Sequence, residues 1–166
     1  MPVRPVLRLP EAVLSRPAAA CGPISDALVA LATDLVDTMR VSPGCVGLAA
    51  PQIGVGLRAF VVDVSGHKKA RSGHGTVVML DPVLVSYSGA ELAREGCMSV
   101  PDLTGDVARP TAVTVRGLAP DGRAVEIEAD AFEARALLHE LDHLDGKVFL
   151  DRVPGPSAVF QRRVYR

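Results

Sequence analysis

The chain has 166 residues, the size of a single domain with room for a hydrophobic core that needs no disulfide or metal ion to fold. Its 18 Lys and Arg residues nearly balance its 19 Asp and Glu residues, and the formal net charge of −1 argues against a strongly basic surface for nucleic acid or an anionic membrane. The three cysteines argue against a disulfide framework, and no apolar run is long enough to span a bilayer, so we expect one soluble, cytoplasmic domain over residues 1–166.

The N-terminal part of the chain predicts an irregular arm followed by one helix. Residues 1–23 are rich in Pro and Ala, which favours an arm without regular secondary structure. Apolar residues at helical spacing then predict a helix from Ser25 to Arg40, with Ser25 as its N-cap. Pro43 and Gly44 end this helix and begin a loop of small residues that continues to Gly54.

The middle of the chain predicts two strands separated by an exposed loop. The segments Arg58–Val64 and Val77–Val85 are rich in β-branched residues, as expected of strands. The polar segment between them, Ser65–Gly75, contains a short basic cluster. This cluster is too short to indicate nucleic-acid binding, and we interpret the segment as a solvated loop. The basic residues are Lys68, Lys69 and Arg71.

The last third of the chain predicts a hairpin and a second helix. Ala112–Arg116 and Ala124–Ala129 flank a Pro-Asp-Gly turn and predict two antiparallel strands. Asp130 begins the helix, and Glu133 follows three residues later, which predicts a capping-box-like pair. Gly146 is expected to end the helix. Strands that pack on one buried helix are typical of the α+β class. We therefore predict antiparallel or mixed β-sheets around this central helix, together with the N-terminal helix.

The second predicted helix carries a pattern typical of metal-dependent hydrolases. His139 and His143 are about one helical turn apart, so their imidazoles project from one face and can bind one ion together. Glu140 lies about 100° round the helix from His139, where a carboxylate can act as general base on a water molecule. The surrounding leucines strengthen this interpretation, because buried polar groups need partners and a metal ion satisfies several at once.

Two histidines leave a metal ion under-coordinated, and Cys97 is the best candidate for a third ligand. It lies in the segment Glu95–Pro101, where Gly96 lets backbones approach closely and Pro101 is expected to end regular structure. A single cysteine is more often a buried apolar residue than a ligand. The histidine pattern in so short a chain nevertheless favours the ligand.

A third segment, Gly44–Gly54, carries Gln52 among small residues that allow another backbone or a substrate to approach closely. The Gln52 amide can donate a hydrogen bond to a carbonyl oxygen that becomes negative during attack, as in an oxyanion hole. Taken alone, the segment slightly favours a simpler interpretation, a glycine-containing turn that Gln52 caps.

Together the three segments resemble the peptide deformylase family. The family patterns GxGxAAxQ, EGCxS and HExDH correspond, in this order, to residues 45–52, 95–99 and 139–143. The matches span about 100 residues, and their shared order makes the resemblance specific. It implies a metal-dependent hydrolase that removes the N-formyl group from the initiator methionine of nascent polypeptides and releases formate.

The resemblance implies a metal site made of Cys97, His139 and His143. In this family the metal ion is natively Fe²⁺, and Zn²⁺ or Ni²⁺ can substitute for it. Three protein ligands leave one position for water, whose pKa a bound metal lowers toward about 7. Glu140 is expected to take a proton from this water and to pass it to the departing amine. A thiolate suits a softer, redox-active ion, so we expect the ferrous form to be sensitive to oxygen.

The resemblance also implies how the substrate is held. The Gln52 side chain and the backbone N–H of Met98 are expected to hold the formyl oxygen, and the backbone of Val46 and Gly47 to align the peptide. The expected partners are N-formyl-methionyl nascent peptides, with ribosome association near the exit tunnel, and we expect a monomer. The residues assigned to peptide binding are Val46, Gly47, Glu95 and Gly96.

The chain departs from the family pattern at three positions. Cys45 replaces the first glycine of the loop motif, and because cysteine adopts positive φ less readily, the loop geometry is expected to differ. Cys45 also brings a thiol near the metal site. Met98 stands where Leu is most common, and Leu138 replaces the Gln that usually precedes the His-Glu pair. None of these changes removes an expected catalytic group.

Charged residues near the motifs suggest an ion pair that orients the metal-binding helix. Asp142 is adjacent to His143, and we consider a pair between Asp142 and Arg109 that Arg135 joins. Separate surface charges explain these three residues equally well.

Two other functions stay open on the sequence. A zincin-type peptidase shares the histidine pattern, but its third ligand is usually a downstream His or Glu, and the segment after His143 contains neither. A non-catalytic paralogue that binds N-formyl peptides could keep the fold, although the presence of both Glu140 and Gln52 disfavours it.

Overall fold

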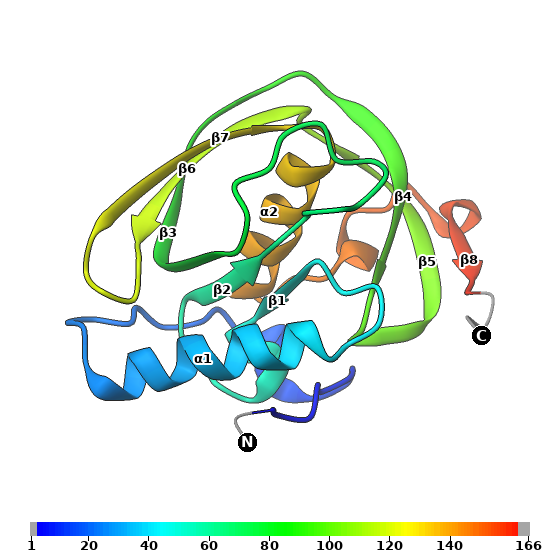
Figure 1. Cartoon of the computed structure of the whole chain (residues 1–166). Helices are drawn as coiled ribbons and strands as arrows, with labels where there is room; N and C mark the ends of the chain where they lie inside the picture. Colours follow the sequence, from blue (N-terminus) through cyan, green and yellow to red (C-terminus); the bar gives the residue numbers. More distant parts are fainter. Residues whose placement is uncertain (1–2, 163–166) are drawn as a thin grey trace.

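The computed structural model describes residues 3–162 and confirms the α+β class (Figure 1). The predicted domain over residues 1–166 extends at both ends beyond these described residues. The helices are α1 (Asp26–Arg40), α2 (Ala131–Leu144) and the short 3-10 helices η1 (Ala12–Ser15), η2 (Ala50–Ile53), η3 (Phe149–Asp151) and η4 (Pro156–Ala158). The strands are β1 (Gly47–Ala49), β2 (Ala59–Val62), β3 (Val77–Ser88), β4 (Glu91–Cys97), β5 (Val100–Arg109), β6 (Ala112–Leu118), β7 (Ala124–Asp130) and β8 (Val159–Gln161).

Two antiparallel sheets flank α2. One sheet has five strands in the order β1-β2-β3-β6-β7, and the other has three strands in the order β4-β5-β8. Figure 1 shows α2 between the long curved strands of the first sheet and the second sheet, while α1 lies beside β1 and β2. The helix that carries the histidines is therefore the centre of the fold.

Strand β2 shows why both helices are needed. All four of its side chains are buried, although successive side chains of a strand point to opposite faces. Ala59 and Val61 pack in the hydrophobic cluster formed with α1, whereas Phe60 and Val62 pack in the cluster formed with α2. The apolar run is thus covered on both faces, and the sheet lies directly against the helix that carries the two histidines.

Both predicted helices and the predicted hairpin are confirmed. Helix α1 begins directly after Ser25, whose Oγ accepts a hydrogen bond from the backbone N–H of Leu28 at 3.3 Å. Strands β6 and β7 pair along their whole length, from Ala112 opposite Asp130 to Leu118 opposite Ala124. Among residues 3–162, no helix is both long and apolar enough to cross a membrane.

Two local predictions are wrong. Asp130 makes no side-chain capping hydrogen bond, and the Glu133 carboxylate bonds to residues of the Ser65–Gly75 loop rather than to the N-cap. Pro101 does not end regular structure, because it is the second residue of β5. In both cases contacts with distant segments override the short-range pattern.

Helix α2 begins with a strained residue. Ala131 has a φ of +48°, in the left-handed region that residues with a Cβ rarely adopt. Its backbone N–H donates to the carbonyl oxygen of Thr111 at 2.9 Å, so the chain position is fixed. We therefore predict that Ala131→Gly raises the free energy of unfolding by about 1 kcal/mol, measured by urea denaturation.

The matched control for this prediction is Ala134→Gly in the same helix. Ala134 is buried and occupies an ordinary helical position, so the same substitution there is expected to lower the free energy of unfolding by about 1 kcal/mol or more. A loss of similar size at both positions would contradict the left-handed conformation of Ala131.

Candidate metal centre

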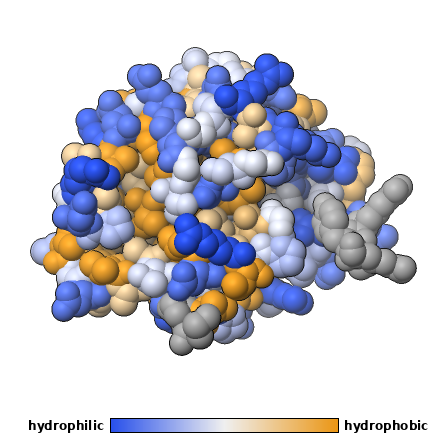
Figure 2. Space-filling view, viewed as in Figure 1, coloured by the Kyte–Doolittle hydropathy of each residue, from blue (hydrophilic) through white to orange (hydrophobic). Residues whose placement is uncertain are grey.

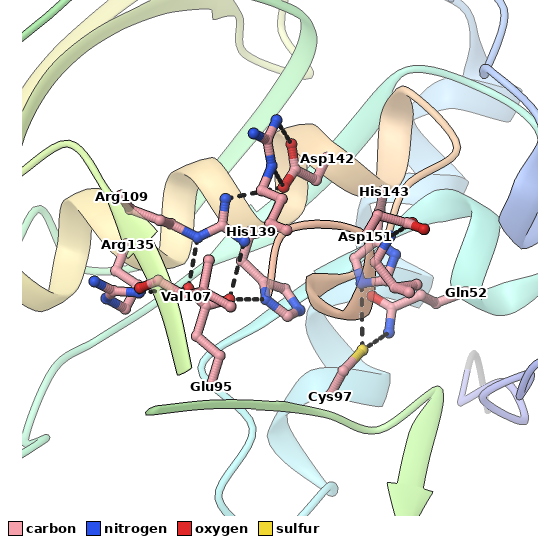
Figure 3. A network of polar contacts seen from close by, with 12 residues as sticks. Gln52, Glu95, Cys97, Val107, Arg109, Arg135, His139, Asp142, His143 and Asp151 are labelled. Carbon is pink, nitrogen blue, oxygen red and sulfur yellow. Dashed lines mark hydrogen bonds and ion pairs between the residues drawn. The ribbon is translucent and has the colours of Figure 1, made fainter. Parts of the chain in front are cut away.

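The three predicted metal ligands come together between β4 and α2. Cys97 ends β4, and His139 and His143 project from one face of α2. Their ligand atoms all lie within 4.8 Å of one another, and Cys97 Sγ is 3.3 Å from His143 Nε2 (Figure 3). Protein ligands bind zinc-like ions at about 2.0–2.3 Å, so this spacing fits a single ion.

The electrostatics of the three ligands favour a thiolate. Burial by itself would raise the pKa of Cys97, but the charge of His143 and hydrogen bonds from both histidines lower this pKa well below its usual range. Burial opposes the protonation of His139, whereas its contacts with Cys97 and Glu95 raise its pKa well above the usual value. The thiolate is the form of cysteine that binds metal ions, and a bound cation can take the place of positive charge beside it.

Glu140 lies beside the ligands and keeps one carboxylate oxygen unpaired. Only 4% of Glu140 is exposed, and within residues 3–162 its Oε1 has no hydrogen-bond partner. Burial raises the pKa of Glu140, and the nearby charges of His139 and His143 oppose this rise. A buried carboxylate with a raised pKa next to metal ligands has the properties of a general base.

Gly47 allows the edge strand β1 to approach Glu140. A Cβ at Gly47 would lie 2.6 Å from Glu140 Oε2, which is too close for any real side chain. The register of β1 against β2 pairs Gly47 with Val62, so the close approach is built into the sheet. Substitution of Gly47 would therefore displace the carboxylate.

Cys45 causes no strain in the loop that precedes β1. The left-handed residue of this loop is Gly44, with a φ of +69°, and Cys45 is not among the residues with positive φ. We expected Cys45 to change the geometry of this loop, but the φ angle of Cys45 shows no such change. The Cys45 thiol donates to the carbonyl oxygen of Gly47 at 3.0 Å, and burial raises the pKa of this thiol to about 12.

Helix η2 holds Gln52 with its amide in a fixed orientation. Gln52 is buried, and its Oε1 accepts a hydrogen bond from the backbone N–H of Ala49 at 3.0 Å. Its Nε2 therefore faces Ser99 Oγ at 3.1 Å and Cys97 Sγ at 3.6 Å. Met98 lies in the turn between β4 and β5, directly after Cys97. The Gln52 amide and the backbone of Met98 thus both lie next to Cys97.

Glu95 connects His139 to two arginines. Its Oε1 lies 2.9 Å from His139 Nδ1 and accepts from Arg109 Nη2 at 2.9 Å, and its Oε2 accepts from Arg109 Nε and from Arg135 Nη1 (Figure 3). Burial would raise the pKa of Glu95, but hydrogen bonds from His139 and Arg109 hold it well below its usual range. Because Nδ1 of His139 is engaged, its Nε2 is the nitrogen left for a metal ion.

The predicted ion pair between Arg109 and Asp142 is confirmed. Arg109 Nη1 donates to Asp142 Oδ2 at 2.9 Å, and both side chains are buried. Arg135 joins the network through Glu95 rather than through Asp142. Arg152, which follows η3, donates to both oxygens of Asp142 at 2.5 and 2.8 Å. The network therefore links β4, β5, α2 and the segment after η3.

The structure shows how the Glu95 side chain is held and adds two residues. Both carboxylate oxygens of Glu95 bond within the protein, and its assignment to peptide binding stays a prediction. Gly96 is exposed, and the Arg162 guanidinium occupies the position that a Cβ atom at residue 96 would take. The sequence analysis missed Ser99, although the EGCxS match contains it. It also missed Arg152, for which the sequence carries no local signal.

Known proteins resemble this chain along most of its length. A family model described as polypeptide deformylase matches residues 3–158. A peptide deformylase from Halothermothrix orenii is 40% identical over 153 residues, which cover 92% of this chain and 95% of that protein. The crystal structure of a peptide deformylase from Legionella pneumophila superposes with a TM-score of 0.84 at 39% identity, covering 94% of this chain and 88% of the other. A Met-Ala-Ser-bound class I type b peptide deformylase from Acinetobacter baumannii has a TM-score of 0.83 at 34% identity, covering 90% of this chain and 99% of the other.

Proposed function

The chain belongs to the peptide deformylase family of metal-dependent hydrolases, which remove N-formyl groups, and we propose below how the residues of this chain carry out that reaction. The substrate is the formyl-methionyl end of a nascent polypeptide, and the products are formate and a free amino terminus. We also propose that residues 1–166 form one catalytic domain. The convergence of Cys97, His139 and His143 within 4.8 Å is the observation that carries the proposal.

We propose that Cys97, His139 and His143 hold one Fe²⁺ ion, for which Zn²⁺ or Ni²⁺ can substitute. One thiolate and two imidazoles are soft to intermediate donors, which suit these three ions better than Mg²⁺ or Ca²⁺. The bond between Glu95 and His139 Nδ1 supports the proposal, because it fixes the ring with Nε2 turned to the other two ligands. When bound, such an ion supplies Lewis-acid chemistry to water and to the formyl carbonyl.

Glu140 is the general base of the proposed mechanism. It takes a proton from the attacking water and delivers it to the amine nitrogen as the C–N bond breaks. Its burial and its unpaired Oε1 support this role. Gln52 Nε2 and the backbone N–H of Met98 donate to the formyl oxygen as negative charge develops on it. The bond from Ala49 to Gln52 Oε1 orients the amide for this task in advance.

The peptide part of the substrate is aligned by the backbone of Val46 and Gly47. Strand β1 is the first strand of the five-stranded sheet, and within residues 3–162 it pairs only with β2, so an extended peptide can add to its other edge. The close approach of Gly47 to Glu140 supports a peptide end beside the base. Glu95 and Gly96 belong to the same proposed peptide site, and the Glu95 side chain also positions His139.

The setting of the reaction follows from its substrate. Nascent chains begin in the cytoplasm, so we propose that the protein acts there as a monomer, near the exit tunnel of the ribosome. The formal net charge of −1 gives the chain no large excess of positive charge. This balance supports recognition of the substrate at the active site rather than on a strongly basic surface.

Anaerobic purification followed by metal analysis and an activity assay tests this proposal. We expect about one iron ion per chain and formate release from formyl-Met-Ala-Ser. In air, the Fe²⁺ form should lose activity faster than a Ni²⁺-substituted form, because a ferrous ion beside a thiolate is readily oxidised. Equal decay rates would count against a ferrous-thiolate site. Binding of the peptide without any formate release would instead indicate the non-catalytic paralogue.

A further inference from the structure

A concave region lies at the N-terminal end of α2, the helix that carries His139 and His143. It is a cavity of about 650 Å³ between the first turns of α2, the start of β4, the turn between β5 and β6, and the segment between β2 and β3. Figure 2 shows mostly hydrophilic residues along the upper part of the molecule, where Figure 1 places the last of these segments and the start of β4. The charged residues of its lining are Lys68, Lys69, Arg71, Arg94, Arg135, Glu91 and Asp130.

The positive charges of this lining are not equally available. Arg135 donates to Glu95 and to two backbone carbonyl oxygens, and Arg94 donates to Asp106 at 2.9 Å while its guanidinium lies 3.8 Å from the centre of the Phe160 ring. The three remaining cations are exposed, and within residues 3–162 they make no ion pair. Lys68, Lys69 and Arg71 therefore carry the charge that a ligand can use.

The loop that carries these cations is anchored to α2. Glu133 is 2% exposed, and its carboxylate accepts hydrogen bonds from Ser72 Oγ and from the backbone N–H of His74, each at 2.9 Å. His74 Nδ1 also lies 2.8 Å from Glu133 Oε1, and the His67 ring stacks on Phe132 with centroids 4.0 Å apart. The same helix carries His139 and His143, so the cations and the metal ligands are held by one rigid element.

The distances match the reach of a short peptide. Arg135 and Phe132 both line the cavity and precede His139 in α2 by four and seven residues, which correspond to about 6 and 10 Å along the helix axis. An extended peptide advances about 3.4 Å per residue. A peptide that has its formyl group at the metal ligands and extends toward the N-terminal end of α2 therefore brings its second and third residues to this level, and its fourth residue beyond it.

We propose that Lys68, Lys69 and Arg71 form a subsite for an acidic side chain at residue 2, 3 or 4 of the substrate, so that the enzyme prefers formyl-peptides with an early Asp or Glu. This inference rests on the proposed function. The two carboxylates of the lining, Glu91 and Asp130, reduce the excess of positive charge but do not cancel it. They also disfavour an RNA backbone, because the affinity for phosphates grows with the number of neutralising cations and facing carboxylates repel phosphates.

Kinetics with charge-matched peptides test the subsite. The reference is formyl-Met-Ala-Ser-Ala with an amidated C-terminus, in which Glu or Lys replaces residue 2, 3 or 4 in turn. At about 20 mM ionic strength we expect kcat/KM to favour Glu over Lys about fivefold at one or more positions. The ratio should fall toward one at about 300 mM salt, because screening weakens exposed charges. It should also fall toward one in the triple variant Lys68→Gln, Lys69→Gln, Arg71→Gln.

The control removes the same charge elsewhere. Arg116, Arg123 and Lys147 are exposed and do not line the cavity, so their triple replacement by Gln should preserve the Glu-to-Lys ratio. A ratio of one at all three positions in the wild-type enzyme, or a ratio that survives loss of the cavity cations, overturns the proposal. It is also overturned if those cations affect only salt-dependent ribosome binding, which would assign them to RNA.

A binding measurement separates this inference from the proposed function. If formyl-Met-Ala-Ser-Ala amide yields no formate, the proposed function fails. Titration calorimetry with the deformylated peptides then still reports the Glu-to-Lys ratio of affinities. Tighter binding of the Glu peptide, abolished in the Lys68, Lys69 and Arg71 variant, supports the subsite, whereas equal affinities contradict it.

Discussion

Glu140→Ala is expected to lower kcat/KM for formyl-Met-Ala-Ser by about a thousandfold or more. General base catalysis contributes about 10²–10⁴, and the Glu140 carboxylate lies directly beside Gly47 of the edge strand, where the proposed mechanism places the peptide. Formate release gives the rate, and elemental analysis of the same sample gives the metal content. The metal content should stay unchanged, because the three ligand side chains are untouched.

Two further variants sharpen this test. Glu140→Gln keeps the volume of the buried side chain but cannot accept the proton, so it should lose activity nearly as completely as the alanine variant. Glu128→Ala removes an exposed carboxylate on β7 and should retain full activity. Activity that survives Glu140→Ala with its metal content intact would mean that another group takes the proton, and the proposed mechanism would fail.

The metal ligands could be predicted because their geometry is local. His139 and His143 need only the helical repeat to meet on one face, and the leucines around them indicate that the face is buried. The third ligand required a different argument, because Cys97 comes from β4, which is distant from α2 in the sequence. The residues around Cys97 and the histidine pattern made it the best candidate, and the shared order of the family patterns strengthened this assignment.

The sequence suggested the pair between Arg109 and Asp142 but could not favour it over separate surface charges, and it gave no signal for Arg152. Arg109 lies at the end of β5, and Arg152 follows η3, so each reaches Asp142 from a different part of the chain. Glu133 is a case in which a short-range pattern predicted the wrong partner. Its spacing from Asp130 predicts a local cap, but Ser72 and His74 offer better donors once the loop folds over α2. Short-range patterns cannot rank such distant competitors.

Arg109→Met is expected to lower the free energy of unfolding by about 3–5 kcal/mol. Arg109 is 3% exposed and is shared by Glu95 and Asp142, so its loss leaves two buried carboxylates with fewer donors, which costs far more than the loss of a surface pair. For a chain of this size the melting temperature should fall by about 10 °C, measured calorimetrically on the metal-free protein. Arg116→Met, on the exposed face of β6, should change it little.

Because Arg109 contacts both Glu95 and Asp142, the effect of the network on metal binding can be separated from its effect on stability. Glu95 contacts His139, so Arg109→Met should weaken metal binding as well as stability, with a tenfold or larger rise in the metal dissociation constant. Within residues 3–162 the hydrogen bonds of the Arg152 side chain go to Asp142, and this side chain is 42% exposed. Arg152→Met should therefore cost about 1 kcal/mol and leave metal affinity nearly unchanged. If both variants weaken metal binding equally, the effect passes through Asp142 and the backbone of α2. If only Arg109→Met does so, the effect passes through Glu95, which then acts on the reaction by fixing the His139 ring.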